Sequence, residues 1–315
     1  MDLRNVFVLN DCATSRRDLS YWYNTLNLYK FVRKGSFDIV HTDLQFAQDK
    51  RWIYNFGNFI TTIHDPFPHS GEDWNYDGSK YSNAINLSKG LVLLNGIQKN
   101  EFCKRYGVHE DKLLINKLGI YDCLTHLMPI GNIEPLNNNV LFFGRIAPYK
   151  GLEYLCEAMR LVRMKISDAT LTVAGGGNLY FDISSYKMGG YVDIHNHYVG
   201  VDELMKLLAR TTVTVCPYTD ATQSGVIMTS YSMGKPVIAS DVGGLSEMIE
   251  NGKTGMLVMP KNPQLLADAI VSLLSDRMKL KEMSNYIKQK FCVGENSWEA
   301  IADRYIQFYH KIKAC

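Results

Sequence analysis

Two basic residues five positions apart stand where an expected strand gives way to an expected helix. The apolar run over 140–143 is followed by Gly144 and Arg145, and Lys150 and Gly151 precede an amphipathic segment. In open parallel sheets, ligands bind where strands end and helices begin. An arginine can hold a phosphate through two hydrogen bonds, and a lysine adds a compact positive charge. The pair predicts a site for a phosphorylated ligand. Taken alone, however, the same two residues are explained equally well as ordinary surface cations.

A second candidate turn for phosphate lies further along the chain. The segment 223–226 leads into an expected helix over 225–233, whose first backbone N–H groups have no partner within the helix. Such groups can bind phosphate or sugar hydroxyls. Ser224 acting as an ordinary N-cap explains the same residues equally well. The glycines at 175–177 are a weaker signal, because a tight turn alone accounts for them.

Length and composition narrow the classes of protein. A chain of 315 residues exceeds the usual limit of a single core, roughly 250–300 residues, so we expect two domains. The 34 basic and 32 acidic residues nearly cancel and form no polybasic arm, which makes nucleic acid a poor candidate partner. Seven cysteines without a Cys-x-x-Cys pair favour a reducing compartment over a disulfide framework or a zinc site. With no signal peptide and no apolar run near about 18 residues, we expect a cytoplasmic protein.

Strands alternate with helices along both halves of the chain, which predicts parallel sheets. Residues 122–138 are rich in proline, glycine and asparagine and form the best candidate linker. We expect strands over 6–9, 38–41, 59–63, 90–94, 113–115, 140–143, 169–174, 192–194, 212–215, 236–239 and 255–258. We expect helices over 18–34, 95–106, 151–164, 202–209, 225–233, 263–275, 277–290 and 297–309. Two consecutive doubly wound α/β domains are the most economical architecture.

Six motifs follow one another in order through the second half of the chain. They are Phe142-Phe-Gly-Arg145 with Lys150-Gly151, Leu171-Thr-Val-Ala-Gly-Gly-Gly177, Val199-Gly-Val201 with Glu203-Leu204, Val213-Thr-Val-Cys-Pro217, Gly234-Lys-Pro-Val-Ile238 and Gly243-Gly-Leu-Ser-Glu247. This order resembles the C-terminal half of family 4 glycosyltransferases, which are retaining, nucleotide-sugar-dependent enzymes of the GT-B fold. The resemblance is close over roughly 139–260 and weaker over 36–120 and the last helix.

The resemblance implies a donor site in this half. Arg145 and Lys150 match residues that contact the diphosphate of a nucleotide diphosphate sugar, and the turn at 199–201 matches one beside the nucleobase. Many members carry two glutamates at the positions of Ala221 and Thr229, so the chain departs from the pattern there. The implied donor-binding residues are Gly144, Gly176, Val201, Gln223, Ser224, Gly225, Val226 and Thr229.

The first half is expected to contribute a histidine. His64 ends an expected strand, where a buried histidine with satisfied hydrogen bonds is the ordinary explanation. The resemblance implies an active-site histidine there, so we predict that His64 contacts the sugar, with Asp65 and His69 as acceptor-side candidates. His64, Arg145 and Lys150 form the predicted catalytic set. We expect no cofactor and no metal, because side chains supply the positive charge.

The resemblance also implies the domain plan. We predict an acceptor-side Rossmann-like domain over 1–130, a nucleotide-sugar-binding domain over 131–295, and a helix over 296–315 that crosses back to the first domain. We expect the first domain to be shortened, because family members usually begin with further elements ahead of the part that resembles 6–41. A truncated product, a minimal domain and a site completed from elsewhere all fit this difference. The last helix carries an aromatic stripe, which we expect to face the core. Its members are Trp298, Tyr305 and Tyr309.

The predicted reaction moves a hexosyl group from a nucleotide diphosphate sugar to a hydroxyl of a glycan or lipid-linked acceptor, with retention, in polysaccharide biosynthesis. Two alternatives stay open, a non-catalytic sugar-nucleotide-binding protein and a GT-B-shaped sugar-nucleotide epimerase. The shortened first domain and the two absent glutamates favour the first of these. The helix over 18–34 joins aromatic and basic residues and could also contact the inner face of a membrane, although packing on a sheet explains it more simply.

Overall fold

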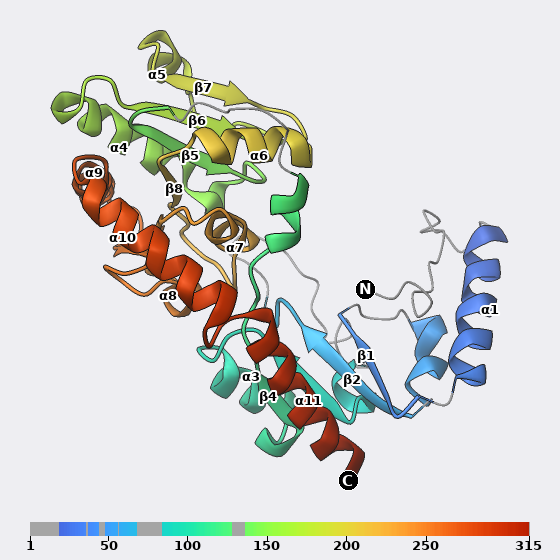
Figure 1. Cartoon of the computed structure of the whole chain (residues 1–315). Helices are drawn as coiled ribbons and strands as arrows, with labels where there is room; N and C mark the ends of the chain where they lie inside the picture. Colours follow the sequence, from blue (N-terminus) through green and yellow to red (C-terminus); the bar gives the residue numbers. More distant parts are fainter. Residues whose placement is uncertain are drawn as a thin grey trace.

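The computed structural model describes residues 19–35, 37–43, 48–55, 57–67, 84–127 and 136–314. Two parallel β-sheets, one in each half of the chain, organise these residues (Figure 1). The predicted α/β plan with two parallel sheets is therefore confirmed. The strand expected over 6–9 and the candidate His69 lie outside the described residues. Among the helices that are described, none has both the length and the apolar character needed to cross a membrane.

The first sheet has four strands in the order β1-β2-β3-β4, all parallel. The central strands β2 and β3 are almost wholly buried, as expected of apolar runs in a parallel sheet that is covered on both faces. The strands are β1 (Ile39–Thr42), β2 (Asn58–Ile63), β3 (Gly90–Leu93) and β4 (Leu113–Ile115). The accompanying helices are α1 (Leu19–Lys34), η2 (Gln48–Asn55), α3 (Lys99–Tyr106) and η3 (Glu110–Lys112).

The second sheet has six parallel strands in the order β10-β9-β8-β5-β6-β7. The chain runs outward from β5 to β7 and then returns to the other side of β5 at β8. The point between β5 and β8 is a topological switch point, where doubly wound sheets bind their ligands beyond the carboxyl ends of the strands. The strands are β5 (Asn139–Phe143), β6 (Thr170–Ala174), β7 (Val192–His195), β8 (Val213–Cys216), β9 (Val237–Ser240) and β10 (Gly255–Val258).

Helices cover this sheet on both faces and supply most of its core. In α4 the residues Leu152, Leu155, Met159 and Val162 are fully buried, and their spacing places them on one face of the helix. The sequence therefore fixes which side of α4 meets the sheet. The helices are η5 (Pro148–Lys150), α4 (Leu152–Lys165), α5 (Ser184–Met188), α6 (Val201–Arg210), α7 (Gly225–Ser232), α8 (Leu245–Met248), α9 (Pro263–Leu274), α10 (Arg277–Lys288) and η6 (Gln289–Val293).

The last helix, α11 (Trp298–Ala314), packs on the first sheet (Figure 1). Phe308 and Ile312 are buried against Ile60 of β2 and Val92 of β3. At the start of the helix, the Trp298 indole donates a hydrogen bond to the backbone oxygen of Ile120, 2.8 Å away. The predicted stripe is partly right, because Tyr305 and Tyr309 pack against this cluster whereas Trp298 stays 43% exposed.

Two local expectations need correction or extension. The helix expected from 95 begins four residues later, because Asn95 accepts a hydrogen bond from the backbone of Gln98, 3.2 Å away, and so forms a turn ahead of α3. The expected linker over 122–138 opens with the helical turn η4 (Asp122–Leu127), whose Leu124 packs on α6. Residues 128–135 lie outside the described residues, so the domain boundary near 130 stays a prediction.

The packing of α11 predicts a specific loss of stability. Replacing Phe308 by alanine removes a buried ring and should lower the free energy of unfolding by about 3–5 kcal/mol. Ile306 lies on the same helix but is 49% exposed, so Ile306→Ala should cost less than about 1 kcal/mol. Urea denaturation followed by tryptophan fluorescence measures both, because Trp52 packs on the core of the first sheet. Equal effects of the two substitutions would contradict the packing.

Candidate functional site

A pocket opens at the carboxyl ends of β5 and β6, where the sequence predicts the phosphate site. Its volume is about 380 Å³, within the usual range of small-molecule sites. Gly175 has a φ of 152°, and a Cβ there would lie 2.0 Å from the backbone oxygen of Gly144, so only glycine allows this close approach. The lining residues are Phe143, Gly144, Arg145, Ala174, Gly175, Gly176, Tyr198, Val199 and Leu204.

Two tyrosines hold the predicted cations beside this pocket. The exposed Arg145 donates from Nη2 to the Tyr149 hydroxyl, 3.0 Å away. The half-buried ammonium of Lys150 lies 3.7 Å from the centre of the Tyr218 ring and 5.0 Å from that of Tyr149. Aromatic faces attract cations, most strongly where water is excluded. Sequence reasoning missed Tyr149 and Tyr218; their positions next to two predicted motifs were the only available signal.

The turn after Lys150 is fixed by close backbone packing. Gly151 has a φ of 66°, and a Cβ at this position would lie 2.0 Å from the backbone oxygen of Pro217. The Lys150 turn therefore lies directly against the segment that follows β8. In this way the glycine holds the cation against the segment that leads from β8 to the second candidate turn.

Burial makes the Lys150 ammonium costly. Desolvation is the largest cause that lowers its pKa, and the nearby Arg145 lowers it further, whereas Cys216 and Asp65 act in the opposite direction. The result is a pKa of about 8 against an ordinary value of 10.5. An oxyanion bound beside Lys150 would raise this pKa again, because an opposite charge nearby stabilises the ammonium form.

The second candidate turn lies beside the first. The Val226 side chain lies 3.5 Å from the Cβ position of Gly144, so the start of α7 faces the glycine-arginine turn. Ser224 occupies the N-cap position, but its side chain makes no capping hydrogen bond. The Thr229 hydroxyl is buried and donates to the backbone oxygen of Gly225, 2.8 Å away, so its proton is already used within the helix.

The glycine pair at the start of α8 positions the segment ahead of α7. A Cβ on Gly243 would lie 1.9 Å from the backbone oxygen of Ala221, and one on Gly244 would lie 2.0 Å from that of Thr222. The backbone N–H of Gly244 donates to Ala221 across 3.1 Å. The predicted Gly-Gly motif therefore packs against the backbone of Ala221, the position at which many family members have their first glutamate. In this chain Ala221 is buried.

The first half of the chain meets this segment from across the cleft. The Gln223 amide nitrogen lies 3.1 Å from His64 Nδ1, and the Thr222 hydroxyl donates to the Asp65 carboxylate. The Asn95 amide donates to the backbone oxygen of Thr222 across 3.0 Å. His64 and Asp65 therefore lie beside the predicted donor turn, although the two halves of the site are far apart in sequence.

An acidic residue stands behind His64. The Asp43 carboxylate lies 3.8 Å from His64 Nε2, and the interaction with this histidine is the largest cause that lowers the pKa of Asp43. With Nδ1 accepting from Gln223, the ring places its Nε2–H toward Asp43. A carboxylate in this position fixes the orientation and the tautomer of a histidine.

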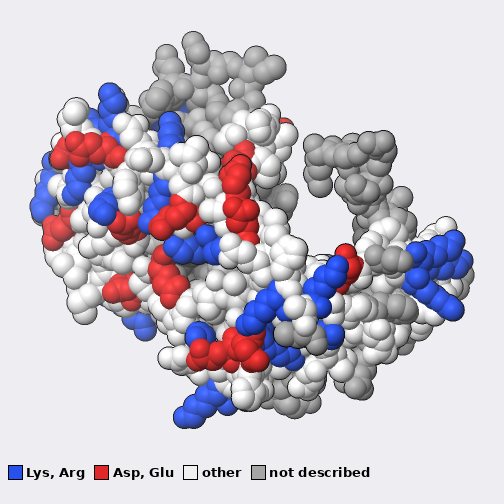
Figure 2. Space-filling model, turned by 60° about the horizontal axis from the view of Figure 1, so that its bottom comes forward, with Lys and Arg blue, Asp and Glu red and all other residues white. Residues whose placement is uncertain are grey.

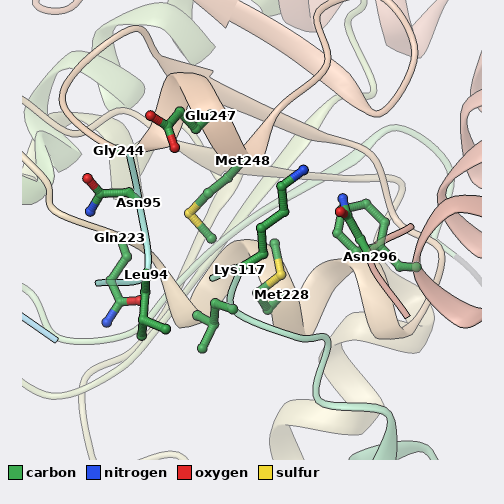
Figure 3. Close-up of a pocket in the computed structure, with 11 residues that line it drawn as sticks. Leu94, Asn95, Lys117, Gln223, Met228, Gly244, Glu247, Met248 and Asn296 are labelled. Atoms are coloured by element: carbon green, nitrogen blue, oxygen red, sulfur yellow. The ribbon is translucent and has the colours of Figure 1, made fainter. Parts of the chain in front are cut away.

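A second pocket lies between the two halves, behind Gln223. Figure 3 shows Asn95 and Gln223 on one side of it and Asn296 on the other. The backbone N–H of Gly96 donates to the Glu247 carboxylate beside this pocket, across 2.8 Å, which adds another link between the halves. The lining residues are Leu94, Asn95, Lys117, Leu118, Gln223, Met228, Gly244, Glu247, Met248, Phe291 and Asn296.

Most of the predicted residues come together, with two differences. Gly144, Arg145 and Gly176 line one pocket, and His64 meets Gln223 across the cleft. Val201 begins α6 and is 39% exposed; Tyr198 and Val199 line the pocket in its place. His69 lies outside the described residues. The roles of all these residues stay predictions.

The chain is similar to proteins of known class. Residues 137–276 match the family described as glycosyl transferases group 1. "Uncharacterized glycosyltransferase MJ1607" of Methanocaldococcus jannaschii is 30% identical over 240 residues, which are 72% of this chain and 59% of the relative. D-inositol 3-phosphate glycosyltransferase of Paenarthrobacter aurescens is 30% identical over 278 residues, which are 84% of this chain and 65% of the relative. The chain thus spans less than two thirds of either relative.

A solved structure extends the likeness to the whole fold. The crystal structure of Anabaena Alr3699/HepE in complex with UDP superposes with a TM-score of 0.66 at 16% identity, covering 93% of this chain and 82% of that one. The two parallel sheets of this chain therefore form the GT-B fold. By its second half the chain belongs to the glycosyl transferases group 1, and its narrower place in family 4 stays a prediction.

The burial of Lys150 predicts an unusual titration. After reductive methylation with isotope-labelled formaldehyde, one lysine resonance should titrate near pH 8, and Lys150→Met should remove it. Exposed lysines should titrate near about pH 10.4. The pKa of Lys150 is lower in the folded chain than in the unfolded chain, so the unfolded chain holds more protons between about pH 8 and 10.5. The free energy of unfolding of the wild type should therefore rise with pH, relative to that of Lys150→Met, across this range. A Lys150 resonance that titrates with the exposed lysines would contradict the burial.

Proposed function

We propose that this chain transfers a hexosyl group from a nucleotide diphosphate sugar to a hydroxyl of a glycan or lipid-linked acceptor, with retention. The observation that carries the proposal is the position of Arg145 and Lys150 at the switch point, beside the start of α7 and across the cleft from His64. The UDP bound to Anabaena HepE and the sugar transfer named for the Paenarthrobacter relative support the same class of donor and reaction.

The donor would lie along the carboxyl edge of the second sheet. Its nucleobase would lie in the pocket beside Tyr198 and Val199, and its diphosphate would reach Arg145 and Lys150. As the sugar leaves, negative charge develops on the diphosphate, and fixed positive charges there lower the barrier. The free N–H groups at the start of α7 would add to this stabilisation. Side-chain cations can therefore do what a metal ion does in other transferases.

The sugar would lie between His64 and Gln223. Both side chains can exchange their mutual hydrogen bond for bonds to sugar hydroxyls. Retention follows if the acceptor attacks from the side of the leaving diphosphate, whose oxygen then accepts the acceptor proton. Asp43 would act as a positioning residue, because it faces the opposite nitrogen of His64.

Removing the exposed cation tests the reaction. Arg145→Ala should lower transfer roughly 100- to 1000-fold, the usual cost of one charge-stabilising group, and should leave the fold intact. Arg160→Ala is the matched control, because Arg160 pairs with Glu157 on the surface of α4. The donor can be chosen by thermal shift among uridine and guanosine diphosphate sugars, since a ligand at a hundred times its Kd adds about 2.7 kcal/mol.

The same assay separates the alternatives. The product anomer, read by NMR, tests retention. Donor binding without transfer to any of a panel of acceptors would favour a non-catalytic binding protein. Donor isomerisation without an acceptor would favour an epimerase. Normal turnover by Arg145→Ala would contradict the assignment of the site.

A lipid-linked acceptor would bring the chain to a membrane surface, and α1 is the candidate contact. Tyr23 and Leu26 are 66% and 56% exposed, and basic residues gather at the end of the molecule where α1 lies (Figure 2). Each lysine near an anionic surface contributes about 1 kcal/mol. Reversing Lys30 and Lys34 to glutamate should therefore reduce co-sedimentation with phosphatidylserine vesicles by roughly tenfold or more.

A charge reversal elsewhere serves as the control for this contact. The pair Lys279→Glu and Lys281→Glu makes the same change in net charge on α10, in the second half of the chain. These substitutions should leave co-sedimentation unchanged. Equal loss from both pairs, or no binding by the wild type, would contradict a membrane contact through α1.

A further inference from the structure

Two histidines and a glutamate converge at the end of β7. Glu203 Oε1 lies 3.0 Å from His195 Nδ1 and 3.2 Å from His197 Nε2, and the second oxygen of Glu203 lies 3.1 Å from His197 Nε2. The ligand atoms of the three residues all lie within 4.8 Å of one another. None of these residues takes part in the proposed transfer, so the cluster needs an explanation of its own.

The spacing of these atoms suits a small divalent cation. Zinc binds histidine nitrogens and carboxylate oxygens at about 2.0–2.2 Å, usually in a tetrahedron, which separates neighbouring ligand atoms by roughly 3.3 Å. The separations of 3.0 to 3.2 Å between Glu203 and the two imidazoles are close to this value. The His197 side chain is 54% exposed, so water can reach the remaining coordination position.

The hydrogen bonds of His195 point the same way. A carboxylate oxygen lies 3.0 Å from each of its ring nitrogens, Asp193 at Nε2 and Glu203 at Nδ1. Carboxylates only accept, and a neutral imidazole donates from one nitrogen. The ring therefore requires either a second proton or a cation between Nδ1 and Glu203. A cation in that place leaves the Nε2–H for Asp193, which is the carboxylate–histidine–metal arrangement that orients many metal ligands.

The local fold explains how the ligands meet. His195 ends β7, and the backbone N–H of His197 donates to the backbone oxygen of His195 across 3.0 Å, which forms a tight turn. Glu203 lies in the first turn of α6, after a short loop. Tyr198 and Val199 stand in this loop and line the pocket beside Arg145.

We propose that His195, His197 and Glu203 bind a divalent transition-metal cation of the zinc class, oriented by Asp193, and that this cation joins β7 to α6. The bound cation fixes both ends of the loop over 198–202, which forms one wall of the pocket. The role of this cation is structural, because it holds the pocket wall in place. The diphosphate would be bound by Arg145 and Lys150 instead. The effect on the donor pocket rests on the proposed function, whereas metal binding itself does not.

Cobalt(II) is the probe that tests the site. The full chain, without an affinity tag and freed of metal by a chelator, is titrated with cobalt(II) and followed by its visible d–d absorption. We expect one strong tetrahedral site with nitrogen and oxygen ligands, displaced by zinc, and no near-ultraviolet thiolate band. That band matters because Cys123 and Cys292 are exposed free thiols that bind metals adventitiously.

Single substitutions locate the site. His197→Asn and Glu203→Gln should each weaken cobalt affinity at least tenfold, whereas His126→Ala removes an exposed histidine elsewhere and should change nothing. Circular dichroism of each variant confirms that the fold is retained. Equal cobalt affinity of wild type, His197→Asn and Glu203→Gln would overturn the proposal, as would a thiolate band that accounts for all of the binding.

A second measurement tests the coupling to the pocket. UDP affinity is compared between metal-free protein and zinc-loaded protein cleared of excess cation, since a diphosphate itself binds zinc. We expect severalfold tighter binding by the zinc-loaded wild type and no difference for His197→Asn. Equal affinities would overturn the coupling. Absence of UDP binding in both forms would count against the proposed function, while the cobalt titration would still decide the metal site.

Discussion

The half-buried ammonium of Lys150 is the interaction on which the rest of the site depends. Taking an ammonium out of water costs free energy, and its lowered pKa records this cost. The face of Tyr218 offsets part of it, and Gly151 allows the backbone to approach Pro217 closely enough to hold the charge there. A bound diphosphate would offset the remainder. The fold thus holds an incompletely neutralised positive charge at the point where a diphosphate donor would supply negative charge.

The sequence predicted what depends on local pattern. Buried parallel strands read as short apolar runs, so β5 and β8 were found within one or two residues, and with them the position of Arg145 at the end of a strand. Glycines that allow close backbone contact also belong to local motifs, as at Gly243 and Gly244. Because topology brings the carboxyl ends of parallel strands to one edge, these motifs were sufficient to predict one shared site.

Contacts between distant segments could not be predicted in this way. A helix was expected from Asn95 onward, but this residue forms a turn and donates to Thr222 from the other half of the chain. Which side chain faces His64 depends on how the two halves meet, and no periodicity encodes that. The cluster around Glu203 could not be predicted for a related reason, because its residues come from a strand end, a turn and a helix start and form no metal-binding sequence motif.

The contact between His64 and Gln223 helps to join the two halves of the cleft in the absence of a sugar. The His64 side chain is 41% exposed and Gln223 is half-buried, so water also reaches this contact. Their mutual hydrogen bond of 3.1 Å therefore makes an ordinary contribution of about 0.5–1.5 kcal/mol. A sugar hydroxyl both donates and accepts, so it can take over both partners without leaving either unsatisfied. Such an exchange would be nearly neutral in hydrogen bonds. Under the proposed function, the attraction of the diphosphate to Arg145 and Lys150 would then be the main source of donor affinity.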